Sequence, residues 1–147
     1  MIFSSHCLLT AYLNTDTSFK YLHQDKRIAL LEKIVELYRG DLLERRDYAD
    51  YLSYERDRCK RVYEVACLKL SALYLNKNMV HKAENILKNA IAFDPYSEDI
   101  CLTLIRFYKK QGKITRARKT LIEFKNRLKS ELDLDIDESF LETVKLD

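Results

Sequence analysis

The chain has 147 residues, enough for one domain with a sizeable buried core. It contains only two glycines and one proline, too few turn residues for a sheet protein, while its abundant Leu, Lys, Glu, Arg and Ala favour helix. A formal net charge of +3 is too small to indicate nucleic-acid binding by itself, so the composition predicts an all-α fold and leaves the partner open.

The first half of the chain predicts short helices beside one long helix. Apolar spacing favours a short helix within residues 2–14 and another over residues 24–38, with Gly40 as its C-terminal stop. Asp47 is the expected N-cap of the next helix, whose pattern runs for about 28 residues, to Leu75, without a breaker. At about 1.5 Å per residue this helix would be roughly 40 Å long, so we expect it to protrude or to bridge two layers.

The second half predicts shorter helices separated by tight turns. Asn78 and Gly112 stand where each turn needs a positive φ, which these two residue types tolerate. Asp94 and Pro95 end one helix, and Ser97 is the expected N-cap of the next. These helices are expected at residues 80–93, 98–111, 114–132 and 138–145, the last as a closing cap.

The same half matches itself at an offset of 34 residues, the period of the tetratricopeptide repeat. The two copies span residues 64–97 and 98–131, and such units bury their apolar faces only by stacking. The sequence therefore predicts a single domain over residues 1–147, an all-α, tetratricopeptide-like α-solenoid of about six to seven antiparallel helices with one long helix. The aligned pairs are Cys67 with Cys101, Leu70 with Leu104, Leu73 with Phe107, Tyr74 with Tyr108, Asn78 with Gly112, Val80 with Ile114, Ala83 with Ala117, Leu87 with Leu121 and Ala90 with Phe124.

The repeat also predicts where a partner would bind. In tetratricopeptide arrays the first helix of each pair lines the concave face, which here would be apolar at one end and basic at the other. Such a groove suits a peptide or an acidic segment, because ammonium and guanidinium groups pair with carboxylates. The alternative is that another domain of the same polypeptide covers this surface. The candidate residues are Leu68, Leu102, Arg106, Lys109 and Lys110, with Tyr51 and Tyr54 as contacts of the protruding helix.

Charge is unevenly distributed near the C-terminus. Residues 106–129 hold ten Lys or Arg and one Glu, whereas residues 131–147 hold seven Asp or Glu and one Lys. Two interpretations stay open: solvated helix faces that neutralise each other locally, or a basic block that contacts an acidic partner. Arg116, Lys119 and Arg127 could also touch phosphates, although direct nucleic-acid binding is not expected, because no recognition helix or aromatic stacking platform accompanies them.

Motifs of catalysis and metal binding are missing from the sequence. There is no phosphate-binding loop, nucleophile elbow or HExxH, and none of the four cysteines is spaced as CxxC. Cys67 and Cys101 are expected to be small buried hydrophobes, with a redox-linked pair as the alternative. No signal peptide or spanning helix is evident either. We therefore expect a cytoplasmic protein that is not an enzyme and uses no cofactor, metal or membrane.

Four sequence pieces, taken in order, resemble a known family. They are LYRGDLL (residues 37–43), a long charged helix containing Tyr51, AFDPYSED (residues 92–99) and LKSELDLDID (residues 128–137). Together they are similar to the bacterial transcriptional activator domain of antibiotic-regulatory-type and response-regulator-like transcription factors. The resemblance covers residues 37–141, and residues 2–36 resemble its helical lead-in. Tyr51 stands where the family often has Trp.

This resemblance implies a regulatory protein-interaction domain that activates transcription by dimerisation or partner binding. The implied partners are the protein's own DNA-binding domain, RNA polymerase or a second subunit. Family members usually carry a winged-helix domain N-terminal to this one, and nothing in the chain resembles it, so we expect a domain of a larger regulator or a stand-alone relative. The alternatives are a generic tetratricopeptide-type adaptor unrelated to transcription, and a domain that binds DNA itself with steep salt dependence.

Overall fold

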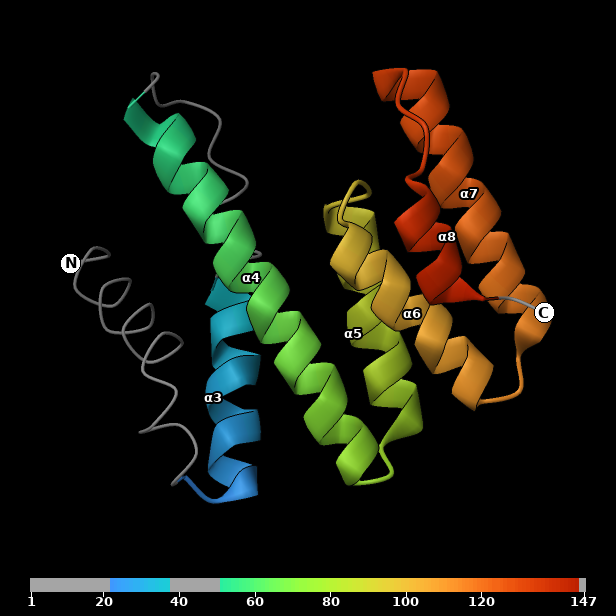
Figure 1. Cartoon of the computed structure of the whole chain (residues 1–147). Helices are drawn as coiled ribbons and strands as arrows, with labels where there is room; N and C mark the ends of the chain where they lie inside the picture. Colours follow the sequence, from blue (N-terminus) through green and yellow to red (C-terminus); the bar gives the residue numbers. More distant parts are fainter. Residues whose placement is uncertain (1–21, 38–50, 146–147) are drawn as a thin grey trace. The chain divides into compact units, whose positions relative to one another are not determined.

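The computed structural model describes residues 22–37 and 51–145 (Figure 1). Within these ranges the chain is helical and has no strand, which confirms the all-α prediction and fits a tetratricopeptide-like solenoid. No helix in this part of the chain combines the length and the apolar content needed to cross a membrane. The helices are α3 (Gln24–Leu37), α4 (Tyr51–Asn76), α5 (Val80–Phe93), α6 (Glu98–Lys110), α7 (Ile114–Leu132) and α8 (Glu138–Val144).

The chain divides into two compact units, one over Met1–Ala83 and one over Glu84–Asp147. The boundary falls within α5, so that α3 and α4 belong to the first unit and α6, α7 and α8 to the second. The single domain over residues 1–147 stays a prediction.

In the first unit α3 packs along α4 (Figure 1). Leu31 and Ile34 of α3 are fully buried, and Tyr63 of α4 is 1% exposed. Apolar residues at helical spacing give each helix one buried face, and the two buried faces pack together to form this layer. The predicted long helix is confirmed, with 26 residues.

Three predicted features lie outside the described residues. They are the helix within residues 2–14, the stop at Gly40 and the N-cap at Asp47. All three stay predictions.

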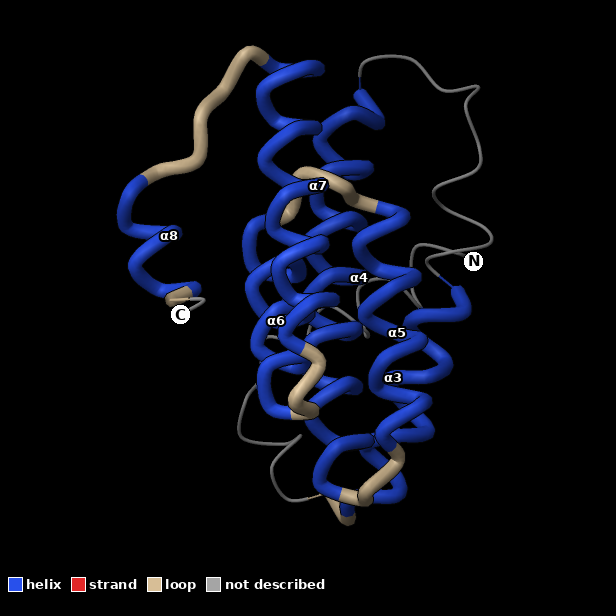
Figure 2. The backbone as a smooth tube through the Cα atoms, turned by 90° about the vertical axis from the view of Figure 1, so that its right-hand side faces the viewer, coloured by secondary structure: helices blue, strands red, loops and turns tan. Residues whose placement is uncertain are grey.

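In the second unit α6 and α7 pack together, and α8 lies to one side of them after an extended loop (Figure 2). The predicted cap is present, because the Ser97 side chain accepts a hydrogen bond from the Ile100 N–H at 3.3 Å. The closing helix is also present, and Asp137 caps it by accepting from the N–H of Ser139. The four helices expected from residue 80 onward all begin where the sequence predicted.

The two turns that are related by 34 residues have the same geometry. In each, the residue five positions after the repeat tyrosine donates its N–H to the carbonyl of Tyr74 or Tyr108, at 2.8 Å in both cases. Asn78 has a φ of 58° and Gly112 a φ of 69°, as predicted. The repeat seen in the sequence is therefore a repeat of backbone structure as well.

The side chains at two further repeat positions are buried in both copies. Ala83 and Ala117 are fully buried, as expected of small residues where helices approach closely. Tyr74 and Tyr108 are 6% and 4% exposed, as expected of large side chains that fill space between helices.

Gly112 allows the turn geometry to be tested. A Cβ at this position would meet no atom within 4 Å, so Gly112→Ala should destabilise the second unit only through the left-handed backbone, by about 1 kcal/mol. Gly112→Asn should lower the free energy of unfolding by only a few tenths of that amount, because Asn78 adopts the same conformation in the first copy. Urea denaturation of both variants measures the two effects, and equal losses would contradict this account.

Candidate protein-interaction surface

Three of the predicted binding residues share one face of α6. Leu102, Arg106 and Lys110 follow one another at four-residue spacing, which places them one above the other on a helix. Leu102 is half-buried, whereas Arg106 and Lys110 are exposed. This face, which we call the α6 face, presents an apolar side chain beside two cations. The remaining residues of the helix bury its opposite side, which contains Ile100, Cys101, Leu104, Ile105, Phe107 and Tyr108.

Three other predicted binding residues belong to α4, in the first unit. Leu68 is half-buried on α4 and belongs to the first unit. Tyr51 and Tyr54 lie in the first turn of α4, where the side chains fall outside the described residues. Their role in binding stays a prediction.

Lys109 has a structural role that the sequence did not reveal. Its Nζ donates to the carbonyl oxygens of Val144 at 3.0 Å and Lys145 at 2.6 Å, at the C-terminal end of α8. The last carbonyls of a helix lack partners within the helix and carry partial negative charge, so an ammonium group there is favourable. Lys109 therefore fastens α8 to α6, and its charge is already engaged within the chain.

Glu84 is the buried charge of the second unit. The residue is only 7% exposed, and its carboxylate accepts hydrogen bonds from three side chains. These are the Tyr108 hydroxyl at 3.2 Å, the Lys113 ammonium at 3.3 Å and the Arg116 guanidinium at 3.0 Å. A buried carboxylate needs such partners, because burial without them is strongly unfavourable.

The pKa values of this cluster follow from its burial and its charges. Burial alone would raise the pKa of the Glu84 carboxyl, but Lys113, then Tyr108 and Arg116, hold that pKa below its ordinary value of 4.5. Burial and then the charge of Glu84 raise the pKa of the Tyr108 hydroxyl. Glu84 is thus a carboxylate and Tyr108 a neutral donor, which is the state that the hydrogen bond requires.

The first unit repeats this arrangement with different residues. Tyr74 donates its hydroxyl to Glu32 of α3 at 2.5 Å, and burial and then Glu32 raise the pKa of Tyr74. Lys82 lies over the Tyr74 ring, with Nζ 5.6 Å from its centroid. Arg116, which is 34 residues after Lys82, lies over the Tyr108 ring at 6.0 Å. Each repeat tyrosine therefore binds a glutamate of an earlier helix and a cation that follows it in the sequence.

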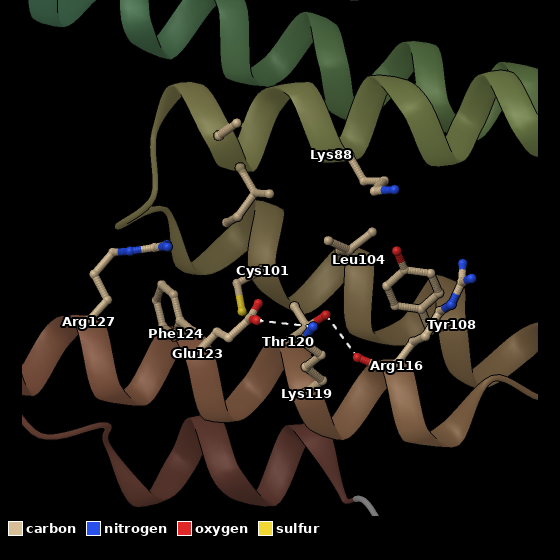
Figure 3. A pocket seen from close by; sticks show the side chains of 12 residues that line it. Lys88, Cys101, Leu104, Tyr108, Arg116, Lys119, Thr120, Glu123, Phe124 and Arg127 are labelled. Carbon is tan, nitrogen blue, oxygen red and sulfur yellow. Dashed lines mark hydrogen bonds and ion pairs between the residues drawn. The ribbon is translucent and has the colours of Figure 1, made fainter.

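A cavity of about 430 Å³ opens between α5 and α7, with residues of α6 at its floor (Figure 3). Its one acidic lining residue is Glu123, which lies 3.7 Å from Lys119. Lys88 and Arg127 line the cavity and form no ion pair among the described residues. We call this site the basic groove; its cations are Lys88, Arg116, Lys119 and Arg127, and its buried floor consists of Cys101, Leu104, Tyr108 and Phe124.

Sequence reasoning found part of the basic groove. It singled out Arg116, Lys119 and Arg127 as cations able to touch phosphates, and all three line the groove. It missed Lys88, which lies on another helix. The repeat offset could have indicated that α5 and α7 are neighbours, but no local pattern marks Lys88 itself.

Cys101 at the groove floor is a protonated thiol. Burial and then the charge of Glu98 raise its pKa to about 12, although Arg127 acts in the opposite direction. A thiol in this state is a poor nucleophile. Cys67 is buried as well, which agrees with the prediction that both are small buried hydrophobes. Within the described residues, no group of three His, Cys, Asp or Glu side chains is placed to hold a metal ion.

Comparisons with known proteins identify the family that the sequence resembles. The family model described as bacterial transcriptional activator domain matches residues 13–143, which include residues 37–141 of the resemblance and most of the expected lead-in. A search of curated proteins and a search of solved structures each found no match. The family match spans both repeats, the α6 face and the basic groove.

Proposed function

Because the chain belongs to the bacterial transcriptional activator domain family, we propose that it activates transcription by binding a protein partner through the α6 face. The family is one of regulatory domains, and the proposal includes the absence of enzymatic activity and a cytoplasmic location. The partner would be the regulator's own DNA-binding domain, RNA polymerase or a second subunit. Family membership favours this function over that of an adaptor unrelated to transcription.

The observation that carries the proposal is the composition of the α6 face. Leu102 supplies apolar area, and Arg106 and Lys110 are exposed beside it with no ion pair among the described residues. Arginine is enriched among the residues that dominate protein interfaces. Because six residues on the opposite side of α6 are buried, the helix is held rigidly and its exposed face is preorganised for binding.

Lys109 is unsuited to a test of this surface, since reversing its charge would also detach α8. We therefore expect Arg106→Glu/Lys110→Glu, in a fusion of the chain to an unrelated DNA-binding domain, to lower activation of a reporter promoter by about tenfold. The matched control is Arg118→Glu/Lys125→Glu on exposed positions of α7, which changes the net charge equally. Its reporter activity should equal that of the unmodified fusion.

Helical content, measured by circular dichroism, should be the same in all three fusions. Full activation by Arg106→Glu/Lys110→Glu would rule out the α6 face as the contact. Equal loss in both double variants would indicate a response to net charge alone and would contradict a specific surface.

A further inference from the structure

The segment that leads from α7 to α8 is rich in acidic and apolar residues, whereas the charged residues that line the basic groove are mainly cations. Acidic and apolar residues alternate over positions 131–137, which are the last two residues of α7 and the loop that follows; we call this segment the acidic strap. Leu132 and Leu134 are 46% and 54% exposed. The side chains of Asp133 and Asp135 are 90% and 75% exposed. The strap therefore presents apolar side chains to solvent with carboxylates on either side.

The strap is held to its own chain mainly through backbone and exposed polar contacts. The Leu134 N–H donates to the Leu128 carbonyl at 3.1 Å, and Lys129 pairs with Asp133 and Asp135 at 3.1 and 3.3 Å. Ion pairs this exposed are weak, so the carboxylates can exchange partners. The contacts fix the course of the strap but leave its leucines uncovered.

The basic groove offers complementary chemistry. Lys88 and Arg127 supply cations that pair with no acid among the described residues, and the floor between them is formed by buried Leu104 and Phe124. An occupant that satisfies both features carries carboxylates on either side of an apolar side chain. Residues 133–135, Asp-Leu-Asp, have this order.

We propose that the acidic strap of a second copy of this chain occupies the basic groove. Leu134 enters over the groove floor, and Asp133 and Asp135 meet the cations of its rim. The strap starts at the end of α7 and is tied to it by Lys129. Figure 3 shows α8 and the groove on opposite sides of α7, so we place the contact between two chains. The inference goes beyond the proposed function, because this contact uses the strap and the groove and none of the residues of the α6 face.

The contact joins two different surfaces, so each chain offers one strap and one groove. A strap of seven residues buries far less than the roughly 1,200 Å² of a stable interface. Association is therefore weak and depends on protein concentration. Because charges contribute to it, association also weakens as salt is raised.

The variants must change the contact and leave the fold intact. Lys88→Glu/Arg127→Glu reverses the two unpaired groove cations. Leu134→Ser/Asp135→Lys changes the strap while sparing Asp133, whose φ of 51° suits few residues, and Asp137, which caps α8. Arg118→Glu/Lys125→Glu is the matched control for charge, on α7 positions that do not line the groove.

The experiment is analytical ultracentrifugation of the whole chain between about 10 µM and 1 mM. The average mass of the wild type and of the α7 control should rise with concentration. In the groove variant and in the strap variant, the association constant should fall by at least about tenfold. An equimolar mixture of those two variants should regain it, since one retains an intact strap and the other an intact groove. Circular dichroism checks that all variants stay helical, and Lys88→Ala/Arg127→Ala replaces the groove variant if it does not.

Three results would overturn the proposal. They are a wild type that stays monomeric at every concentration, a mixture that does not associate, and a loss in the α7 control equal to that in the groove variant. Groove variants that lose binding of duplex DNA but keep their self-association would assign the groove to nucleic acid instead. Reporter activation depends on the α6 face, so a failure of the proposed function alone leaves the mass measurements unchanged.

Discussion

Phe124→Ala should lower the free energy of unfolding of the second unit by about 3–5 kcal/mol. Phe124 is 2% exposed, and its ring stacks on that of Phe140 in α8, with centroids 5.7 Å apart. The substitution leaves a cavity beneath the basic groove and removes the surface on which α8 packs. Urea denaturation gives the size of the loss, and hydrogen exchange of the α6, α7 and α8 amides locates it.

The matched control is Ile122→Ala on the same helix. Ile122 is 57% exposed, so its truncation should change stability by no more than about 0.5 kcal/mol. A loss below about 1 kcal/mol in Phe124→Ala would mean that α7 and α8 are not packed as described.

Glu84→Ala is expected to cost about 2–3 kcal/mol. It leaves the Tyr108 hydroxyl, in a residue only 4% exposed, without its acceptor, and an unsatisfied buried polar group costs about 1–3 kcal/mol. The cost stays below the roughly 3–5 kcal/mol of a fully buried ion pair, because the side chains of Lys113 and Arg116 are 37% and 58% exposed and can be hydrated instead. Urea denaturation measures the loss.

Glu123→Ala serves as its control. The Glu123 side chain is 58% exposed and lies 3.7 Å from Lys119, so its removal should cost no more than about 0.5 kcal/mol. Equal losses in the two variants would show that Glu84 is not held in a buried cluster.

The lowered pKa of Glu84 also predicts a dependence on pH. A carboxyl whose pKa is lower in the folded state than in the unfolded state adds stability above the unfolded value of about 4.5, and this stability is lost as the pH falls through the folded value. The difference in melting temperature between wild type and Glu84→Gln should therefore be largest near neutral pH and shrink below about pH 4.5. A difference that stays constant in acid would contradict the lowered pKa.

The sequence predicted the helices well because each carries its own boundary signals. Ser97 and Asp137 are caps, and Asn78 and Gly112 are residues that accept a positive φ, so these ends depend on local chemistry. The offset of 34 residues then correctly indicated that the two turns share one geometry. Each cap and each turn involves residues that are close together in the sequence, where sequence patterns are informative.

The candidate site was harder to predict because it depends on contacts between distant residues. The sequence alone suggests that Lys109 is an exposed cation at the end of a helix. In the structure it caps the C-terminal end of α8, at a residue 35 positions further along the chain. Glu84 has no unusual neighbours in the sequence, and its cluster forms only when α6 and α7 pack beside α5. Lys88 joins the basic groove for the same reason.

The tyrosine clusters bear on how a protein of this kind can gain or lose length. One comprises Glu32, Tyr74 and Lys82, and the other Glu84, Tyr108 and Arg116, so no member is shared. An in-frame deletion of residues 84–117 would remove the second cluster whole and leave the first intact, without stranding a buried hydroxyl. Duplication of the same segment would add a complete cluster. The buried tyrosine contacts therefore come in complete modules, and a change of one repeat length keeps each remaining module whole.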